Sequence, residues 1–124
     1  MREYVPTEAE EQEAVIEWAK AMEARVPELE LLHHIPNGGR RSKAEAGRFK
    51  AQGVKAGVPD LSLPVPRGRY HGLYVEMKRK RGGRISPEQE WWIERLQKQG
   101  YFVDVCFGAD EAIRRIEWYL TEAK

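Results

Sequence analysis

The stretch from residue 59 to residue 78, PDLSLPVPRGRYHGLYVEMK, decides the fold. Over residues 60–65, leucine or valine alternates with a polar residue or proline, which is the pattern of a β-strand. Residues 66–72 contain proline and glycine and predict a connecting loop. Residues 73–78 alternate again, so we predict a second strand that pairs with the first as a hairpin.

The second predicted strand carries different kinds of side chain on its two faces. Because successive side chains of a strand point to opposite faces, Glu76 and Lys78 share one face with Tyr74. The opposite face is apolar and comprises Leu73, Val75 and Met77. The polar face is therefore the place to look for chemistry.

N-cap signals outside this stretch predict where two helices begin. Thr7 and Glu10 have the spacing of a capping box, and Ser86 precedes Pro87 as a second N-cap. The predicted elements are a helix from Thr7 to about residue 25, a strand over residues 29–35, a helix over residues 42–52, the two hairpin strands, a helix from residue 86 to residue 100, a strand over residues 101–107 and a helix from about residue 109. The positions predicted to be buried on the helices are Val15, Trp18 or Ala19, and Met22; Trp92, Ile93 and Leu96; and Ile113, Ile116 and Leu120.

The element order α-β-α-β-β-α-β-α predicts an α/β fold, a mixed β-sheet flanked by α-helices. The 124 residues fit one compact domain spanning residues 1–124. No apolar run approaches the ~18 residues that a membrane helix needs, and the acidic N-terminus lacks the apolar core of a secretory signal. The single Cys106 excludes an intrachain disulfide and a multi-cysteine zinc site, so we expect a reducing cytoplasm.

Positive charge is concentrated in the middle of the chain. Residues 36–84 hold 13 Lys and Arg against 3 acidic residues, a net charge of +10, whereas the rest of the chain has a net charge of −9. The overall charge of +1 hides this separation. Such asymmetry is typical of a protein face that meets a polyanion such as nucleic acid. The alternatives are a solvated basic surface and a strip that binds an acidic protein partner.

A candidate metal centre follows from the hairpin. If the two strands pair, Asp60 lies beside Glu76, and two adjacent carboxylates are unfavourable unless a cation lies between them. Ligation by oxygen alone favours Mg²⁺ or Mn²⁺. Lys78 shares the face of Glu76, and its ammonium group can position an attacking water or offset charge on a phosphate. These three residues supply the parts for phosphodiester hydrolysis, although a Glu-x-Lys pattern alone is also common on exposed strands.

These residues resemble the PD-(D/E)xK nuclease superfamily. More narrowly, four stretches look like a stand-alone VRR-NUC domain of phage or bacterial type: Gly57-Val58-Pro59-Asp60, Val75-Glu76-Met77-Lys78, Ser86-Pro87-Glu88-Gln89 and His33-His34-Ile35-Pro36-Asn37-Gly38-Gly39. The resemblance spans about residues 8–120, with the motifs in the family's order. It implies a restriction-endonuclease-like fold and metal-dependent, structure-selective DNA cleavage by a homodimer. The implied substrate is branched DNA such as Holliday junctions, in the cytoplasm of a bacterium or phage-infected host.

The resemblance also implies a fuller set of site residues. The catalytic residues would be Asp60, Glu76, Lys78 and Gln89, and the ligands of Mg²⁺ or Mn²⁺ would be Glu8, Asp60, Glu76 and Met77. Glu11 is an alternative to Glu8, and both also fit a solvated acidic helix start that the helix dipole favours. Gln89 has a local alternative, because its spacing from Ser86 is that of a capping box.

Residues on the turns and loops of the basic segment predict contacts with the DNA backbone. These are Asn37, Arg40, Arg41, Lys43, Lys80, Arg81 and Arg84. His33 and His34 are expected to be structural or to contact phosphate. Trp91, Trp92 and Trp118 are expected in the core or at an interface, not as base-stacking platforms. Two further functions stay open, a non-catalytic DNA-binding module and a nuclease that acts on single-stranded DNA or RNA.

Overall fold

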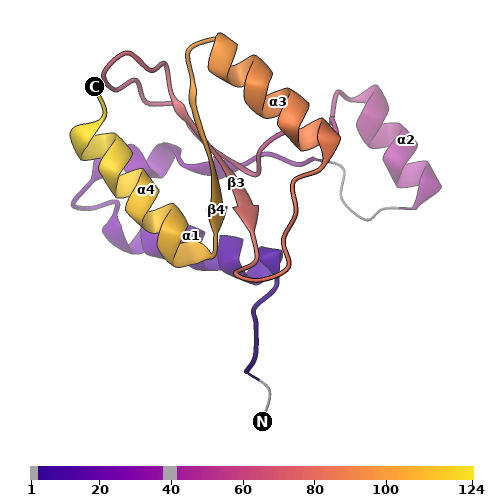
Figure 1. The fold of residues 1–124 in the computed structure, drawn as a ribbon, viewed down its shortest axis with the longest axis horizontal. Helices are drawn as coiled ribbons and strands as arrows, with labels where there is room; N and C mark the ends of the chain where they lie inside the picture. The colour runs from indigo at the N-terminus through magenta and orange to yellow at the C-terminus, as the bar shows by residue number, and fades with distance from the viewer. Residues whose placement is uncertain (1–2, 38–41) are drawn as a thin grey trace.

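The computed structural model describes residues 3–37 and 42–124 of the chain (Figure 1). The elements are α1 (Glu8–Met22), the 3₁₀ helix η1 (Pro27–Leu31), β1 (His33–His34), α2 (Lys43–Ala51), β2 (Leu61–Leu63), β3 (Leu73–Lys78), α3 (Pro87–Lys98), β4 (Phe102–Phe107) and α4 (Ala109–Glu122). This order matches the predicted one, with η1 as an added element. The α/β fold with a helix-flanked mixed sheet is therefore confirmed.

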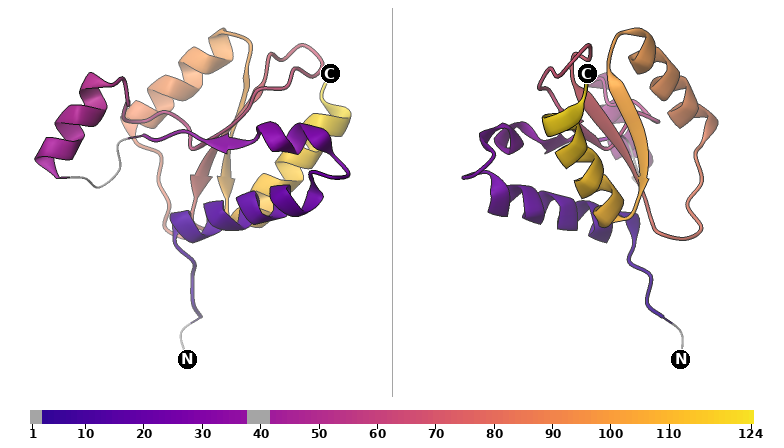
Figure 2. Two further views of the ribbon diagram at one scale, coloured as in Figure 1. Left: turned by 180° about the vertical axis from the view of Figure 1, so that it is seen from behind. Right: turned by 60° about the vertical axis from the view of Figure 1, so that its left-hand side comes forward.

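The sheet has four strands in the order β1-β2-β3-β4. Strands β1, β2 and β3 pair antiparallel, so the predicted hairpin is present, and β4 lies parallel to β3. The right-hand view of Figure 2 shows α1 and α4 on one side of the sheet and α3 on the other. Because the apolar face of β3 packs against the α1–α4 layer, its polar face lies on the side of α3.

The hydrophobic core lies between the sheet and the α1–α4 layer. The apolar face of β3 is buried there, as the alternation of its residues predicted. Helix α1 contributes Val15 and Ala19, and α4 contributes Ile116 and Tyr119, all at most 3% exposed. The hydroxyl of Tyr119 donates a 2.7 Å hydrogen bond to the carbonyl of Val65. A buried phenol needs such a partner, so this bond accounts for a tyrosine at the centre of the core.

The predicted strand over residues 29–35 is confirmed only at His33–His34, and its first part is wrong. Residues Pro27–Leu31 form η1, and only the two residues of β1 extend the sheet. Proline at the start of η1 fixes a helical φ. The buried leucines, Leu29 and Leu32, are three residues apart, which fits the three-residue turn of a 3₁₀ helix and not the two-residue period of a strand. The strand β2 is also shorter than predicted, because Pro64 and Pro66 cannot donate ladder hydrogen bonds.

The predicted burial of α3 is only partly met. Trp92, Ile93 and Leu96 are only half-buried, and no residue of α3 is fully buried. The physical reason is that, among the helices of the described part of the chain, α3 lies without a neighbour on its side of the sheet (Figure 2). On α4, Ile116 is buried as predicted, whereas Ile113 and Leu120 are half-buried beside it.

Helix α2 stands apart from the sheet, at the right of Figure 1. Ser42 caps it by accepting a hydrogen bond from the Glu45 amide, and Gly53, at φ +95°, follows its last turn. No residue of α2 is buried. Of the helices in the described part of the chain, none is long and apolar enough to cross a membrane.

Candidate active site

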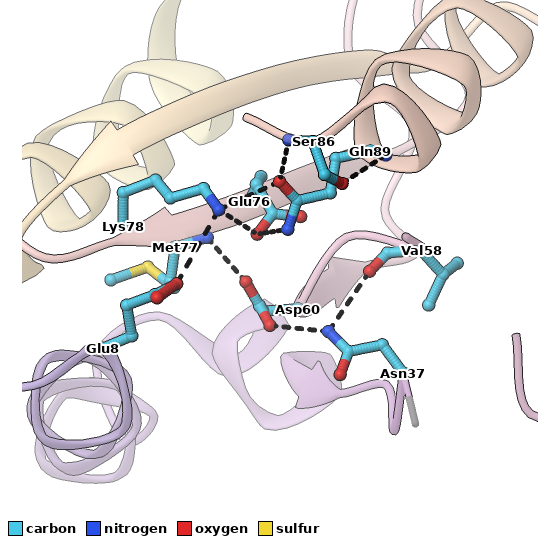
Figure 3. A network of polar contacts seen from close by, with 9 residues as sticks. All are labelled: Glu8, Asn37, Val58, Asp60, Glu76, Met77, Lys78, Ser86 and Gln89. Carbon is cyan, nitrogen blue, oxygen red and sulfur yellow. Dashed lines mark hydrogen bonds and ion pairs between the residues drawn. The ribbon is translucent and has the colours of Figure 1, made fainter. Parts of the chain in front are cut away.

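The hairpin register brings Asp60 beside Glu76. Leu61 pairs with Val75, so the next step along the antiparallel ladder places Asp60 opposite Glu76. The Asp60 carboxylate accepts a 2.8 Å hydrogen bond from the backbone N–H of Met77, which fixes it against β3 (Figure 3). The two carboxylates predicted from the Pro-Asp and Glu-x-Lys motifs thus lie together at one edge of the hairpin.

Glu76 is the most deeply buried ionisable group of the site. It is 1% exposed, and its Oε1 atom has no hydrogen-bond partner among the residues that the structure describes. Burial, and next the adjacent carboxylate of Asp60, raise the pKa of Glu76 to about 9. A proton or a cation is therefore needed to stabilise this carboxylate at neutral pH.

Lys78, Gln89 and Glu76 form a connected network. The Lys78 ammonium donates a 2.9 Å hydrogen bond to Gln89 Oε1, and the Gln89 amide nitrogen donates to Glu76 Oε2 at 3.3 Å. The ammonium nitrogen lies 3.9 Å from the nearest Glu76 carboxylate oxygen. Gln89 also accepts a hydrogen bond from the Ser86 backbone and completes the capping box of α3. Gln89 thus makes the capping-box contacts and the contacts with Lys78 and Glu76 in one conformation, and its catalytic role stays a prediction.

The two acidic candidates of α1 have different surroundings. Glu8 lies 3.9 Å from the Lys78 ammonium, at the opening of the site. Glu11 is 5% exposed and points away from the site, and its Oε1 atom accepts a 3.2 Å hydrogen bond from the backbone N–H of Ala109 at the start of α4. Only Glu8 is thus placed beside the Asp60–Glu76–Lys78 group, and Glu11 joins α1 to α4.

Asn37 and His34 support Asp60 from β1 and the segment after it. The Asn37 side-chain amide donates a 3.0 Å hydrogen bond to Asp60 Oδ1, and His34 Nδ1 lies 2.8 Å from the Asp60 carbonyl oxygen. The sequence predicted Asn37 as a DNA contact and missed its contact with Asp60. The turn signal around Asn37 located the residue, but spacing alone could not show that β1 pairs with β2 next to Asp60.

These groups surround an open cavity of about 820 Å³. Its walls come from the start of α1, the end of β1, the β2–β3 hairpin and the start of α3. The lining residues are Thr7, Glu8, Ala9, Gln12, His34, Asn37, Asp60, Glu76, Met77, Lys78 and Gln89. The cavity is large enough for a phosphodiester group together with hydrated ions.

Of the described residues predicted to contact DNA, Asn37 lines this cavity and the others do not. Lys43, at the start of α2, and Lys80, Arg81 and Arg84, in the loop after β3, are exposed. Arg81 forms a 2.8 Å ion pair with Glu3. Arg40 and Arg41 lie outside the described residues.

Comparison with protein families gives one match over most of the chain. The profile of the VRR-NUC domain matches residues 4–110. The chain belongs to the VRR-NUC domain family. A solved structure described as a VRR_NUC domain protein is 34% identical to this chain, with a TM-score of 0.79, and the match covers 98% of this chain and 93% of that one. Comparison with curated proteins gave no match.

Because the chain belongs to a nuclease domain family, we asked whether the carboxylates of this VRR-NUC domain could bind a metal ion. The unpartnered Glu76 Oε1 atom and the neighbouring Asp60 are hard oxygen donors, which suit a divalent cation such as Mg²⁺ or Mn²⁺. Within residues 3–37 and 42–124, no three His, Cys, Asp or Glu side chains are grouped closely enough to hold a metal ion. Two protein carboxylates still fit Mg²⁺, which usually keeps several waters and takes one or two carboxylates.

The other predicted ligands fit this arrangement less directly. Glu8 is oriented toward Lys78 and would act from the edge of the site. The Met77 side chain is in the core, and its N–H binds Asp60. A role for Met77 as a ligand would therefore require its carbonyl oxygen, and it stays a prediction.

The raised pKa of Glu76 predicts how stability depends on pH in the absence of metal. Between about pH 4.5, the ordinary value, and about pH 9, the folded VRR-NUC domain holds one proton more than the unfolded chain. The free energy of unfolding in EDTA should therefore fall as pH rises through this window, with a slope of at most about 1.4 kcal/mol per pH unit for one proton. Urea denaturation of the native protein and Glu76→Gln at several pH values measures this slope. Glu76→Gln should flatten it, and equal slopes in the two proteins would contradict the prediction.

Proposed function

We propose that this VRR-NUC domain is a divalent-metal-dependent DNA endonuclease of the PD-(D/E)xK type, which hydrolyses phosphodiester bonds. The proposed active site consists of Asp60, Glu76 and Lys78. The observation that carries the proposal is the buried Glu76 carboxylate, which has an unpartnered oxygen and lies beside Asp60 in an open cavity. An unpaired buried carboxylate oxygen is unfavourable, and a second carboxylate beside it adds repulsion that a cation relieves. A bound cation would give the Glu76 Oε1 atom the partner that it lacks.

In this proposal, the residues of the chain hold and orient the reacting groups. Asp60 and Glu76 hold the cation, and the Met77 N–H and the Asn37 amide fix the Asp60 carboxylate. When bound, Mg²⁺ or Mn²⁺ supplies Lewis acidity, which offsets charge on the phosphate and lowers the pKa of a water. Gln89 holds the Lys78 ammonium toward the centre of the site, where it can position the attacking water or stabilise negative charge on the phosphate. Hydrolysis forms one bond from water oxygen to phosphorus and breaks one phosphorus–oxygen ester bond.

Branched DNA is the substrate that we propose, and a homodimer is the proposed working unit. The basic segment, with a net charge of +10 over residues 36–84, supports binding to a polyanion. Two-fold symmetry would present two such cavities to two strands, and symmetric dimers are the common oligomers of soluble proteins. The similarity to VRR-NUC domains supports a nuclease, and the single Cys106 fits the proposed location in a reducing cytoplasm.

A cleavage assay on strand-labelled substrates tests this function. We expect the native protein to cut a four-way junction in Mg²⁺ or Mn²⁺, at least about tenfold faster than linear duplex of the same sequence, and to cut neither in EDTA. Light scattering under the same conditions should show a dimer. Cleavage that persists unchanged in EDTA would contradict metal dependence, and equal rates on both substrates would contradict branch selectivity. A fully active monomer would exclude the dimer as the working unit.

A further inference from the structure

Two tryptophans stand at the start of α3, outside the cavity described above. Trp92 is anchored by a 3.1 Å hydrogen bond from its indole nitrogen to the carbonyl of Ala56. Trp91 packs edge-on against Trp92, and the guanidinium of Arg95 lies 4.8 Å from the centre of the Trp91 ring. Trp91 is nevertheless 50% exposed. Of the two places that the sequence predicted for it, the core or an interface, the core is excluded, and the ring is held in place at the surface.

The exposed ring borders a hollow of about 310 Å³. Its lining residues are Ala56, Pro87, Glu88, Trp91 and Trp92. The hollow lies where the loop before β2 packs on the first turn of α3. Gly57 shows how close this packing is, because a Cβ atom there would lie 2.6 Å from the Glu88 backbone. Gly57 also has φ +91°, which favours glycine.

This hollow adjoins the candidate active site through the same two elements. Gln89 and Trp92 are three residues apart on α3, so they lie one turn apart on one side of the helix. Ala56, at the other wall, precedes Asp60 by four residues in the same loop. The hollow and the candidate active site are therefore built on the same loop and the same helix, although Trp91, two residues after Gln89, lies on another side of α3.

Positive charge continues from the hollow toward α2. A second hollow, of about 540 Å³, shares Ala56 with the first and is lined also by Lys50 and Lys55. Both lysines are exposed. Arg95 lies 3.9 Å from Glu94, and Glu88 lines the first hollow, so the positive charge of the path comes from Lys50 and Lys55 in the second hollow. A ligand that fits this path has a flat apolar group for the ring and anionic groups for the lysines.

We propose that an unpaired nucleobase of the DNA substrate stacks on Trp91 in this hollow, with the adjoining phosphates on the side of Lys50 and Lys55. This inference rests on the proposed function, because it assigns the single-stranded part of a branched substrate to a hollow built on the same loop and helix as the proposed cleavage centre. Aromatic rings beside a basic groove are the usual means of holding single-stranded nucleic acid, and every base offers a flat face for stacking. The arginine stacked on Trp91 adds a favourable cation–π contact.

The test compares DNA affinity in EDTA, where cleavage is absent. The ligands are a duplex with a short unpaired flap and the fully paired duplex, and the proteins are the native chain, Trp91→Ala, Trp91→Phe and the control Leu31→Ala. Leu31 is also 50% exposed but lies on η1. We expect Trp91→Ala to weaken flap binding about fivefold or more and to change duplex binding less than about twofold. Trp91→Phe should restore most of the loss, and Leu31→Ala should behave like the native protein.

A fluorescent 2-aminopurine in the flap gives a second measurement. Stacking on Trp91 should quench its fluorescence in the native complex and not in the Trp91→Ala complex. Equal flap affinity and equal quenching in the two proteins would overturn the proposal. If Trp91→Ala instead turned a dimer into a monomer with flap binding intact, the ring would be an interface between copies. A native protein that binds the flap through Trp91 but cuts no DNA in Mn²⁺ would support the stacking site and contradict the nuclease function alone.

Discussion

Replacing Lys78 by methionine is expected to lower the rate of DNA cleavage by at least about a hundredfold, the usual loss when one preorganised charge-stabilising group is removed. Methionine keeps an unbranched, apolar stem but lacks the ammonium that donates to Gln89 and lies near Glu76. DNA affinity should change by less than about threefold, since Lys78 is buried and the basic loops are unchanged. Single-turnover cleavage and equilibrium binding in Ca²⁺ separate the two effects.

The matched control is Lys98→Met, which removes the same charge from the exposed last turn of α3. We expect Lys98→Met to cut DNA at close to the native rate. Isosteric changes at the carboxylates, Asp60→Asn and Glu76→Gln, should resemble Lys78→Met. Near-normal cleavage by Lys78→Met, in a protein that unfolds as the native one does, would remove the lysine from the mechanism.

Mn²⁺ is expected to raise the melting temperature of the native protein and to leave that of Glu76→Gln almost unchanged. The unfolded chain cannot gather Asp60 and Glu76, so the metal binds the folded state preferentially. Above the dissociation constant, each tenfold increase in Mn²⁺ should add about 1.4 kcal/mol to the free energy of unfolding, which corresponds to about 5 °C for a domain of this size. Four melts, with each protein in EDTA and in Mn²⁺, measure the difference.

Glu76 is a better probe than Asp60 for this experiment. Asp60 accepts hydrogen bonds from both Met77 and Asn37, so Asp60→Asn disturbs existing contacts. Glu76 Oε1 has no partner among the described residues, and glutamine removes the charge that burial opposes. Glu76→Gln should therefore melt at or above the native protein in EDTA. Equal stabilisation of both proteins by Mn²⁺ would place the metal elsewhere, and a marked loss of stability in EDTA would make Glu76 a structural carboxylate.

The part of the site that could be predicted from sequence is the part fixed by local periodicity. Alternation along β3 placed Glu76 and Lys78 on one face, and the hairpin then brought Asp60 beside them. The capping boxes of α1 and α3 were equally local, because each involves residues three apart. Such features depend on residues that are close in the sequence and can therefore be predicted without knowing the tertiary contacts.

The parts that were wrong or missed depend on how distant elements pack. The choice between a strand and η1 over residues 29–35 was decided by which leucines the α1 layer buries. The contact of Asn37 with Asp60, 23 residues apart along the chain, requires β1 to pair with β2. The exposure of Trp91 depends on α3 lying alone on its side of the sheet. None of these is encoded in spacing within one element.

Anomalous diffraction from crystals grown with Mn²⁺ tests the central claim most directly, because it locates the metal without reference to activity. We expect the strongest anomalous peak within about 2.5 Å of carboxylate oxygens of both Asp60 and Glu76, with Glu76 Oε1 as a ligand. The same peak should vanish in Glu76→Gln crystals. A native crystal that binds Mn²⁺ elsewhere, with Glu76 still unliganded at an alkaline pH, would contradict the assignment of this pair as the metal centre.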